Sequence, residues 1–232
     1  MRCPHCDAPA GWWHSVPVIG RLATRGRCAS CHTKLPSLHP LVTVMTVAAF
    51  LAVAWFFIAE ADPGPTVATV VVIVAYLFFV TITVGLTMID LETHLLPNAI
   101  VLPSYAVATA LLTLACVLGA DWSALLRGAI AMAALWAFYF LLRLVSPRGM
   151  GGGDVKLAGV IGLYLGWMGW GAVLLGVFSA FALGGLFGVG LLLTRRAGRR
   201  TAIPFGPWML LGAWVGIFAG EAIARMYAAG PG

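Results

Sequence analysis

Residues 66–89 read TVATVVVIVAYLFFVTITVGLTMI, an apolar run of 24 residues that ends directly before Asp90. A helix that crosses a bilayer needs about 20 consecutive, mostly apolar residues. No charged side chain interrupts this run, and an acidic residue follows it at once. The stretch therefore predicts a membrane-spanning helix with a carboxylate at one membrane surface.

Apolar runs of similar length recur along the chain. They predict six other spans: 41–59, 98–119, 123–145, 154–168, 170–194 and 205–226. Only 9% of the 232 residues are charged, whereas about a quarter are charged in a soluble domain. Lipid offers no partners to backbone polar groups, so apolar spans of this length form helices. We predict an all-α fold, a polytopic bundle of about seven transmembrane helices in a lipid bilayer.

The basic residues are unevenly placed along the chain. Lys and Arg gather in the first 34 residues, around 143–156 and at 195–200, and the net charge is +6. Basic loops beside membrane helices stay in the cytoplasm. The pattern predicts a cytoplasmic amino terminus and no nucleic-acid partner. Because the chain opens with polar residues rather than an apolar core, no cleavable signal peptide is predicted.

Two Cys-x-x-Cys pairs lie near the start of the chain. Cys3 and Cys6 are separated from Cys28 and Cys31 by 21 residues. Two such turns, brought together by a loop, supply the four thiolates of a tetrahedral zinc site. The alternative is a pair of disulfides, which the reducing cytoplasm disfavours. We predict a cytoplasmic segment, 1–38, that binds one structural zinc ion, followed by a transmembrane domain, 39–232.

Three carboxylates are predicted on the cytoplasmic side of the membrane: Asp90, Glu92 and Asp154. The remaining acidic residues fall in the cysteine segment, the outer loops or the last span: Asp7, Glu60, Asp62, Asp121 and Glu221. Asp90 ends one span and Asp154 begins another, so both should lie at the same depth. Two carboxyl groups that share a proton can activate water and polarise a carbonyl without a metal. Glu92 is a rival partner for Asp154, and the structural alternative is that each aspartate only ends or caps a helix.

Three glycines, Gly151, Gly152 and Gly153, precede Asp154 directly. Without side chains they let another backbone approach Asp154 closely. Lys156 follows two residues after the aspartate, where it could steer protonation, bind phospholipid head groups or anchor the helix at the membrane surface. The stretch is therefore a candidate substrate-binding element.

At this point the sequence resembles the type IV prepilin peptidases. Residues 151–156 match their Gly-x-Gly-Asp-x-Lys motif, Asp90 with Leu96-Pro97-Asn98 matches the surroundings of their first aspartate, and the cysteine pairs and residues 203–207 also match in order. The resemblance implies a membrane aspartic endopeptidase that uses Asp90 and Asp154. It implies a prepilin or pseudopilin substrate, cut on the cytoplasmic side of a bacterial inner membrane. No oligomeric state is predicted.

Many members of that family also methylate the new amino terminus with S-adenosylmethionine. Two departures bear on this expectation. Members usually have an additional span before the cysteines, and many have a glutamate where this chain has Thr43 in His39-Pro40-Leu41-Val42-Thr43. The resemblance therefore predicts the peptidase, and Thr43 argues against methyl transfer. The alternatives are a bifunctional peptidase and N-methyltransferase, or a catalytically silent, zinc-bearing pilin assembly protein.

Overall fold

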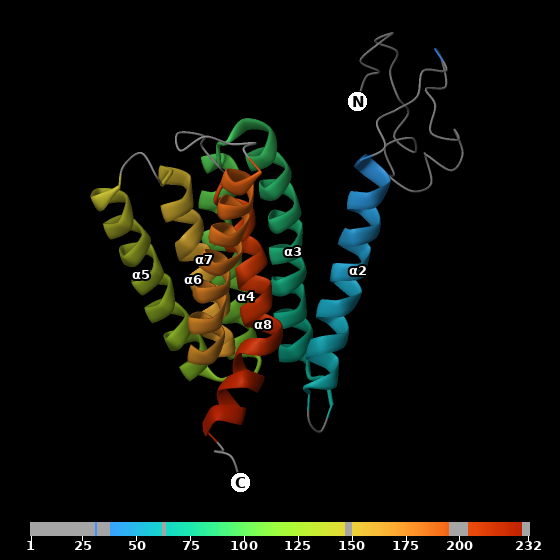
Figure 1. Ribbon diagram of the computed structural model, residues 1–232. Coiled ribbons are helices and arrows are strands. Elements are labelled where there is room, and N and C mark those ends of the chain that lie inside the picture. Colours follow the sequence, from blue (N-terminus) through green and yellow to red (C-terminus); the bar gives the residue numbers. More distant parts are fainter. Residues whose placement is uncertain (1–30, 32–37, 62–63, 147–149, 195–203, 229–232) are drawn as a thin grey trace. The chain divides into compact units, whose positions relative to one another are not determined.

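The computed structural model describes residues 31, 38–61, 64–146, 150–194 and 204–228. This part of the chain contains seven helices and no strand, which confirms the predicted all-α fold (Figure 1). The helices are α2 Leu38–Ala59, α3 Val67–Thr93, α4 Asn98–Val117, α5 Trp122–Val145, α6 Gly152–Met168, α7 Trp170–Leu193 and α8 Gly206–Ala228. The chain divides into two compact units, Met1–Ala52 and Val53–Gly232. Asp90 and Asp154 both belong to the second unit.

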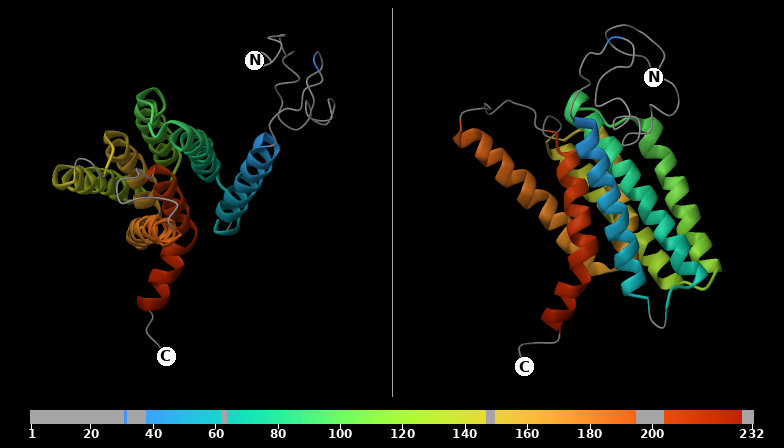
Figure 2. Two further views of the ribbon diagram at one scale, coloured as in Figure 1. Left: turned by 45° about the horizontal axis from the view of Figure 1, so that its top comes forward. Right: turned by 90° about the vertical axis from the view of Figure 1, so that its right-hand side faces the viewer.

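Six of these helices are long and apolar enough to cross a membrane. They agree with the predicted spans to within a few residues. The helix outside this group is α6, which has 17 residues. It lies among α4, α5, α7 and α8 and contacts each of them (Figure 2). Nearly every side chain from Asp154 to Trp167 is buried. The predicted fifth span is therefore an interior helix, covered by protein rather than by lipid.

Small residues let α5 approach α6 closely. A Cβ atom added at Gly162 would lie 2.5 Å from the Ala131 carbonyl oxygen, and one added at Gly166 would lie 2.8 Å from the Gly128 Cα. Side chains at these glycines would push the backbones apart, so the contact depends on their absence. The antiparallel register of the two helices follows: Gly128 lies opposite Gly166, and Ala131 lies opposite Gly162.

Two tyrosines join α3 to α6. The Tyr76 hydroxyl donates a 2.8 Å hydrogen bond to the Tyr164 carbonyl oxygen, and the Tyr164 hydroxyl donates one of 3.0 Å to the Ala75 carbonyl oxygen. Both side chains are fully buried. A buried tyrosine hydroxyl must find a partner, so the pair determines how α3 lies along α6. This alignment matters because α3 carries Asp90 and α6 carries Asp154.

Two charged side chains hold the turn between α6 and α7. The Arg127 guanidinium donates hydrogen bonds to the carbonyl oxygens of Gly166 (2.7 Å) and Trp167 (2.9 Å) at the end of α6. Glu221 accepts hydrogen bonds from the backbone N–H groups of Gly171 (2.9 Å) and Ala172 (3.3 Å) at the start of α7. Helix ends leave these backbone groups without internal partners. Arg127 and Glu221 thus satisfy backbone groups at the ends of α6 and α7. This structural role explains why two charged residues occur within apolar helices.

We expect Glu221→Leu to destabilise the protein by about 1–3 kcal/mol, because the first amides of α7 lose their acceptor. Thermal unfolding of the purified protein in detergent measures this change. The exposed Glu60→Gln is the matched control and should leave the unfolding temperature unchanged. Equal unfolding temperatures for wild type and Glu221→Leu would contradict the assigned capping role.

Candidate active site

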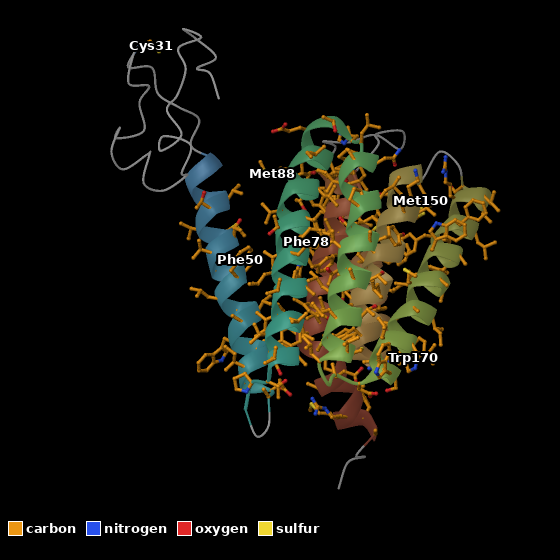
Figure 3. All side chains as sticks on the ribbon, turned by 180° about the vertical axis from the view of Figure 1, so that it is seen from behind. Cys31, Phe50, Phe78, Met88, Met150 and Trp170 are labelled. Carbon is orange, nitrogen blue, oxygen red and sulfur yellow. The ribbon has the colours of Figure 1, made fainter. Side chains whose placement is uncertain are left out.

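The two aspartates predicted as partners lie on different helices at one end of the second unit. Asp90 is in the last turn of α3 and is 4% exposed; Asp154 is in the first turn of α6 and is 8% exposed. Figure 3 labels Met88 and Met150, which mark these two places at the same end of the bundle. The carboxyl groups are close enough to interact electrostatically. The fold therefore brings together two acidic side chains that are 64 residues apart in sequence.

Asp154 is held by the beginning of its own helix. Its Oδ2 atom accepts a 3.0 Å hydrogen bond from the backbone N–H of Gly151, the residue that caps α6. The structural alternative considered from the sequence is therefore partly right, because this carboxylate does serve the helix end. One oxygen is used in this way, and the other accepts no hydrogen bond from the described residues. The hydrogen bond to one oxygen orients the carboxyl group, and the other oxygen remains able to exchange a proton or accept a hydrogen bond.

Asp90 has a less satisfied environment. The backbone of Gly206, the first residue of α8, lies close to its carboxyl group, because a Cβ atom added there would lie 2.6 Å from Asp90 Oδ2. Its Oδ2 atom is fully buried and has no hydrogen-bond partner among the described residues. A buried polar atom left without a partner costs about 1–3 kcal/mol. The Asp90 side chain does not cap a helix, so folding alone offers no reason for this cost.

The chain turns sharply after Asp90. His94 ends α3 in the left-handed conformation, with φ of 53°, and its N–H donates a 2.9 Å hydrogen bond to the Asp90 carbonyl oxygen. The following Leu96 side chain packs against both partner segments. A Cβ atom at Gly153 would lie 2.7 Å from the Leu96 Cβ, and one at Gly206 would lie 3.6 Å from its Cδ1. Leu96 thus joins the segments that carry the two aspartates.

Each of the three glycines before Asp154 meets a different neighbour. A Cβ atom at Gly151 would lie 3.2 Å from Asp154 Oδ2, and one at Gly152 would lie 2.6 Å from the Arg143 guanidinium; Gly153 faces Leu96. Side chains at Gly151 and Gly153 would crowd the Asp154 carboxyl group and Leu96, whereas one at Gly152 would meet the far end of the flexible Arg143 side chain. Of the three glycines, Gly151 is exposed.

The other two predicted supporting residues lie beside the site. Glu92 is exposed, so the buried carboxyl group facing Asp154 comes from Asp90. Lys156 is half-buried, and its Nζ atom donates a 2.8 Å hydrogen bond to Asn98 Oδ1 at the start of α4. The Tyr105 hydroxyl donates to the Lys156 carbonyl oxygen. Lys156 therefore ties the first turn of α6 to α4, close to the turn that follows Asp90.

The sequence did not predict that Gly206 lies against Asp90 or that Leu96 packs against Gly153. A cue to Gly206 was present in the stretch Phe205-Gly206-Pro207, where a glycine sits between bulky residues at a helix start. Nothing in that stretch says which carboxyl group it meets. The structure does not test the zinc prediction. Of the four predicted ligands it describes Cys31, whereas Cys3, Cys6 and Cys28 lie outside the described residues.

Comparisons with known proteins agree in both halves of the chain. A family described as Bacterial Peptidase A24 N-terminal domain matches residues 1–57, and the Type IV leader peptidase family matches residues 77–189, which include both aspartates. A relative from Stutzerimonas stutzeri is 31% identical over 97% of this chain and 74% of its own length. One from Aeromonas hydrophila is 32% identical over 97% and 73%, and one from Neisseria gonorrhoeae 28% over 96% and 72%. Each is named prepilin leader peptidase/N-methyltransferase. No solved structure matches.

Proposed function

This chain belongs to the type IV prepilin leader peptidases, and we propose that Asp90 and Asp154 are its catalytic pair. The protein is a protease that spans a bacterial membrane several times. One observation carries the assignment to these residues: two buried carboxyl groups from α3 and α6 interact at one end of the bundle. The buried Asp90 Oδ2 without a partner supports it, because that atom keeps hydrogen-bonding capacity that the described residues do not use.

The two carboxyl groups hold one proton between them, because two neighbouring buried carboxylates do not readily ionise together. The ionised group takes a proton from water as the water oxygen attacks the scissile carbonyl carbon. The protonated group gives its proton to the carbonyl oxygen, which forms a neutral tetrahedral intermediate. Collapse of the intermediate breaks the C–N bond: the leaving amine takes the proton that the first carboxyl group gained from water, and a hydroxyl group of the intermediate returns a proton to the second carboxylate as the product carbonyl forms. Both carboxyl groups then return to the starting state.

The proposed substrate is a type IV prepilin or pseudopilin, cut on the cytoplasmic side. The relatives' names support the substrate class. The positive-inside pattern supports the side, because the loop between α5 and α6 is basic and leads into Asp154. On the same grounds we assign the protein to the inner membrane.

Mass spectrometry of a prepilin matured by the purified protein tests this proposal. We expect a single cut just after the glycine that precedes the substrate's hydrophobic helix. Substrate that is bound but uncut would instead support the silent assembly protein. A cut elsewhere would contradict the proposed specificity.

Methyl transfer is a second candidate activity, because the relatives' names include N-methyltransferase. Thr43, in place of the family glutamate, argues against it. With S-adenosylmethionine present, we expect the mature amino terminus to keep its unmodified mass. A gain of one methyl group in the same spectrum would show that this chain is bifunctional.

We further propose that Cys3, Cys6, Cys28 and Cys31 hold one structural zinc ion. Four thiolates in two close pairs suit tetrahedral zinc. Elemental analysis of the purified protein should find one zinc per chain, and Cys28→Ser should lose it. Cys116→Ser is the control, because Cys116 is buried in α4 and belongs to neither Cys-x-x-Cys pair. Zinc retained by the Cys28→Ser variant would contradict this ligand set.

A further inference from the structure

The contact between α5 and α6 continues toward Asp154 in a regular register. Gly128 lies opposite Gly166, and Ala131 lies opposite Gly162. Farther along, Leu135 of α5 and Ala158 of α6 line the same small cavity. Each step of three or four residues along α5 thus corresponds to four residues back along α6. One more step places Tyr139 opposite Asp154.

Direct observations agree with this placement. Tyr139 is 2% exposed and lines the small cavity together with Ala158 and Ile161, one and two turns after Asp154. Its phenol group and the Asp154 carboxyl group are close enough to interact electrostatically. Tyr139 therefore points into the space between α5 and the face of α6 that carries Asp154.

Aromatic neighbours hold the Tyr139 ring in place. It stacks on Phe181 of α7, with ring centroids 5.7 Å apart and an interplanar angle of 24°. The Phe205 ring lies 6.4 Å away, and Phe205 directly precedes Gly206, whose backbone lies against the Asp90 carboxyl group. A ring fixed on two sides has few alternative rotamers, which makes its hydroxyl group suitable for orienting a neighbour.

We propose that Tyr139 is a positioning residue for the peptidase reaction, donating a hydrogen bond from its hydroxyl group to the Asp154 carboxylate when substrate closes the site. This inference rests on the proposed role of the two aspartates. Hydrogen bonds in active sites often tighten only in the substrate complex. With Gly151 and Tyr139 as donors, Asp154 is the ionised partner and general base. Asp90, whose Oδ2 has no partner, is then the protonated partner that donates to the carbonyl oxygen.

The other groups around Asp154 leave this role open to Tyr139. From α3 comes the Asp90 carboxyl group, and from α5 the Arg143 guanidinium lies over Gly152. The Tyr105 hydroxyl on α4 donates to the Lys156 carbonyl oxygen, and the Gly206 backbone of α8 lies against Asp90 Oδ2. Among the described residues, Tyr139 is thus the hydroxyl donor that faces Asp154.

Steady-state kinetics of Tyr139→Phe on a prepilin substrate over a range of pH test the proposal. The substitution keeps the ring and its stacking and removes only the hydroxyl group. We expect kcat to fall about tenfold with KM unchanged. The acidic limb of the pH–rate profile should move to higher pH, because the ionised base loses a donor. Tyr164→Phe is the structural comparator: it removes a buried hydroxyl that bonds to the Ala75 backbone and should leave the pH profile in place.

Two results would overturn the proposal. One is a Tyr139→Phe enzyme with the kcat and pH profile of wild type. The other is an equal loss of activity in Tyr139→Phe and Tyr164→Phe with neither profile shifted, which would show a packing role only. Asp154→Asn, measured alongside, separates this question from the proposed function. If Asp154→Asn cleaves normally, the catalytic pair itself is wrong, whatever Tyr139→Phe does.

Discussion

Asp90→Asn and Asp154→Asn should each abolish detectable cleavage of a co-expressed prepilin, a loss of roughly 10²–10⁴-fold in rate. An amide can neither take a proton from water nor give one to the carbonyl oxygen as a carboxyl group does. Asparagine has nearly the same shape, so the bundle should still fold and insert in the membrane. For Asp90, the change also removes a buried acid with an unpartnered oxygen. The ratio of mature to precursor pilin on a gel measures the effect.

Glu92→Gln is the matched control for these two variants. Glu92 lies two residues after Asp90 at the end of the same helix, but its side chain is exposed. It should mature pilin at the wild-type rate. Normal cleavage by the Asp154→Asn variant, with protein present in the membrane, would disprove the two-aspartate assignment.

Gly206→Ala should lower kcat about 100-fold although it adds only one methyl group. That methyl carbon would lie 2.6 Å from Asp90 Oδ2, inside van der Waals contact. Either the carboxyl group or the first turn of α8 must move, and a misplacement of about 1 Å can cost 100-fold in rate. The helix itself should persist, because alanine favours helix more than glycine does. Pilin cleavage and thermal unfolding, measured on one preparation, separate the two effects.

Gly185→Ala on α7 is the corresponding control, since a Cβ atom there would meet nothing within 4 Å. It should change neither measurement. If Gly206→Ala cleaved pilin as fast as wild type, the close contact between α8 and Asp90 would have no catalytic importance.

Much of this fold could be predicted because a bilayer imposes simple rules on sequence. The apolar runs gave the helix bounds to within a few residues, and alternating topology put the end of α3 beside the start of α6. That was sufficient to pair Asp90 with Asp154. It was not sufficient to show that α6 is covered by protein on nearly every side, because an interior helix and a lipid-facing helix have similar composition.

The contacts that complete the site depend on how helices slide past one another. Gly206 lies beside Asp90 because α8 begins level with the last turn of α3. A shift of α8 by one turn along its axis would separate the two residues. Tyr139 faces Asp154 only through the four-residue register set by Gly162 and Gly166. A hydropathy pattern carries no information on such offsets. The hydrogen bonds that the Tyr76 and Tyr164 hydroxyl groups make between α3 and α6 could not be predicted either, because each tyrosine looks in the sequence like any aromatic residue in an apolar span.

The burial of α6 limits the direction from which a polypeptide can reach Asp154. A substrate helix lying in lipid cannot run alongside α6, because neighbouring helices occupy that flank. We therefore expect the peptide to approach Asp154 from the end of the bundle, over the exposed Gly151. An enzyme reached in this way would cut its substrate where the chain leaves the hydrocarbon, and it would leave the apolar segment within the bilayer intact.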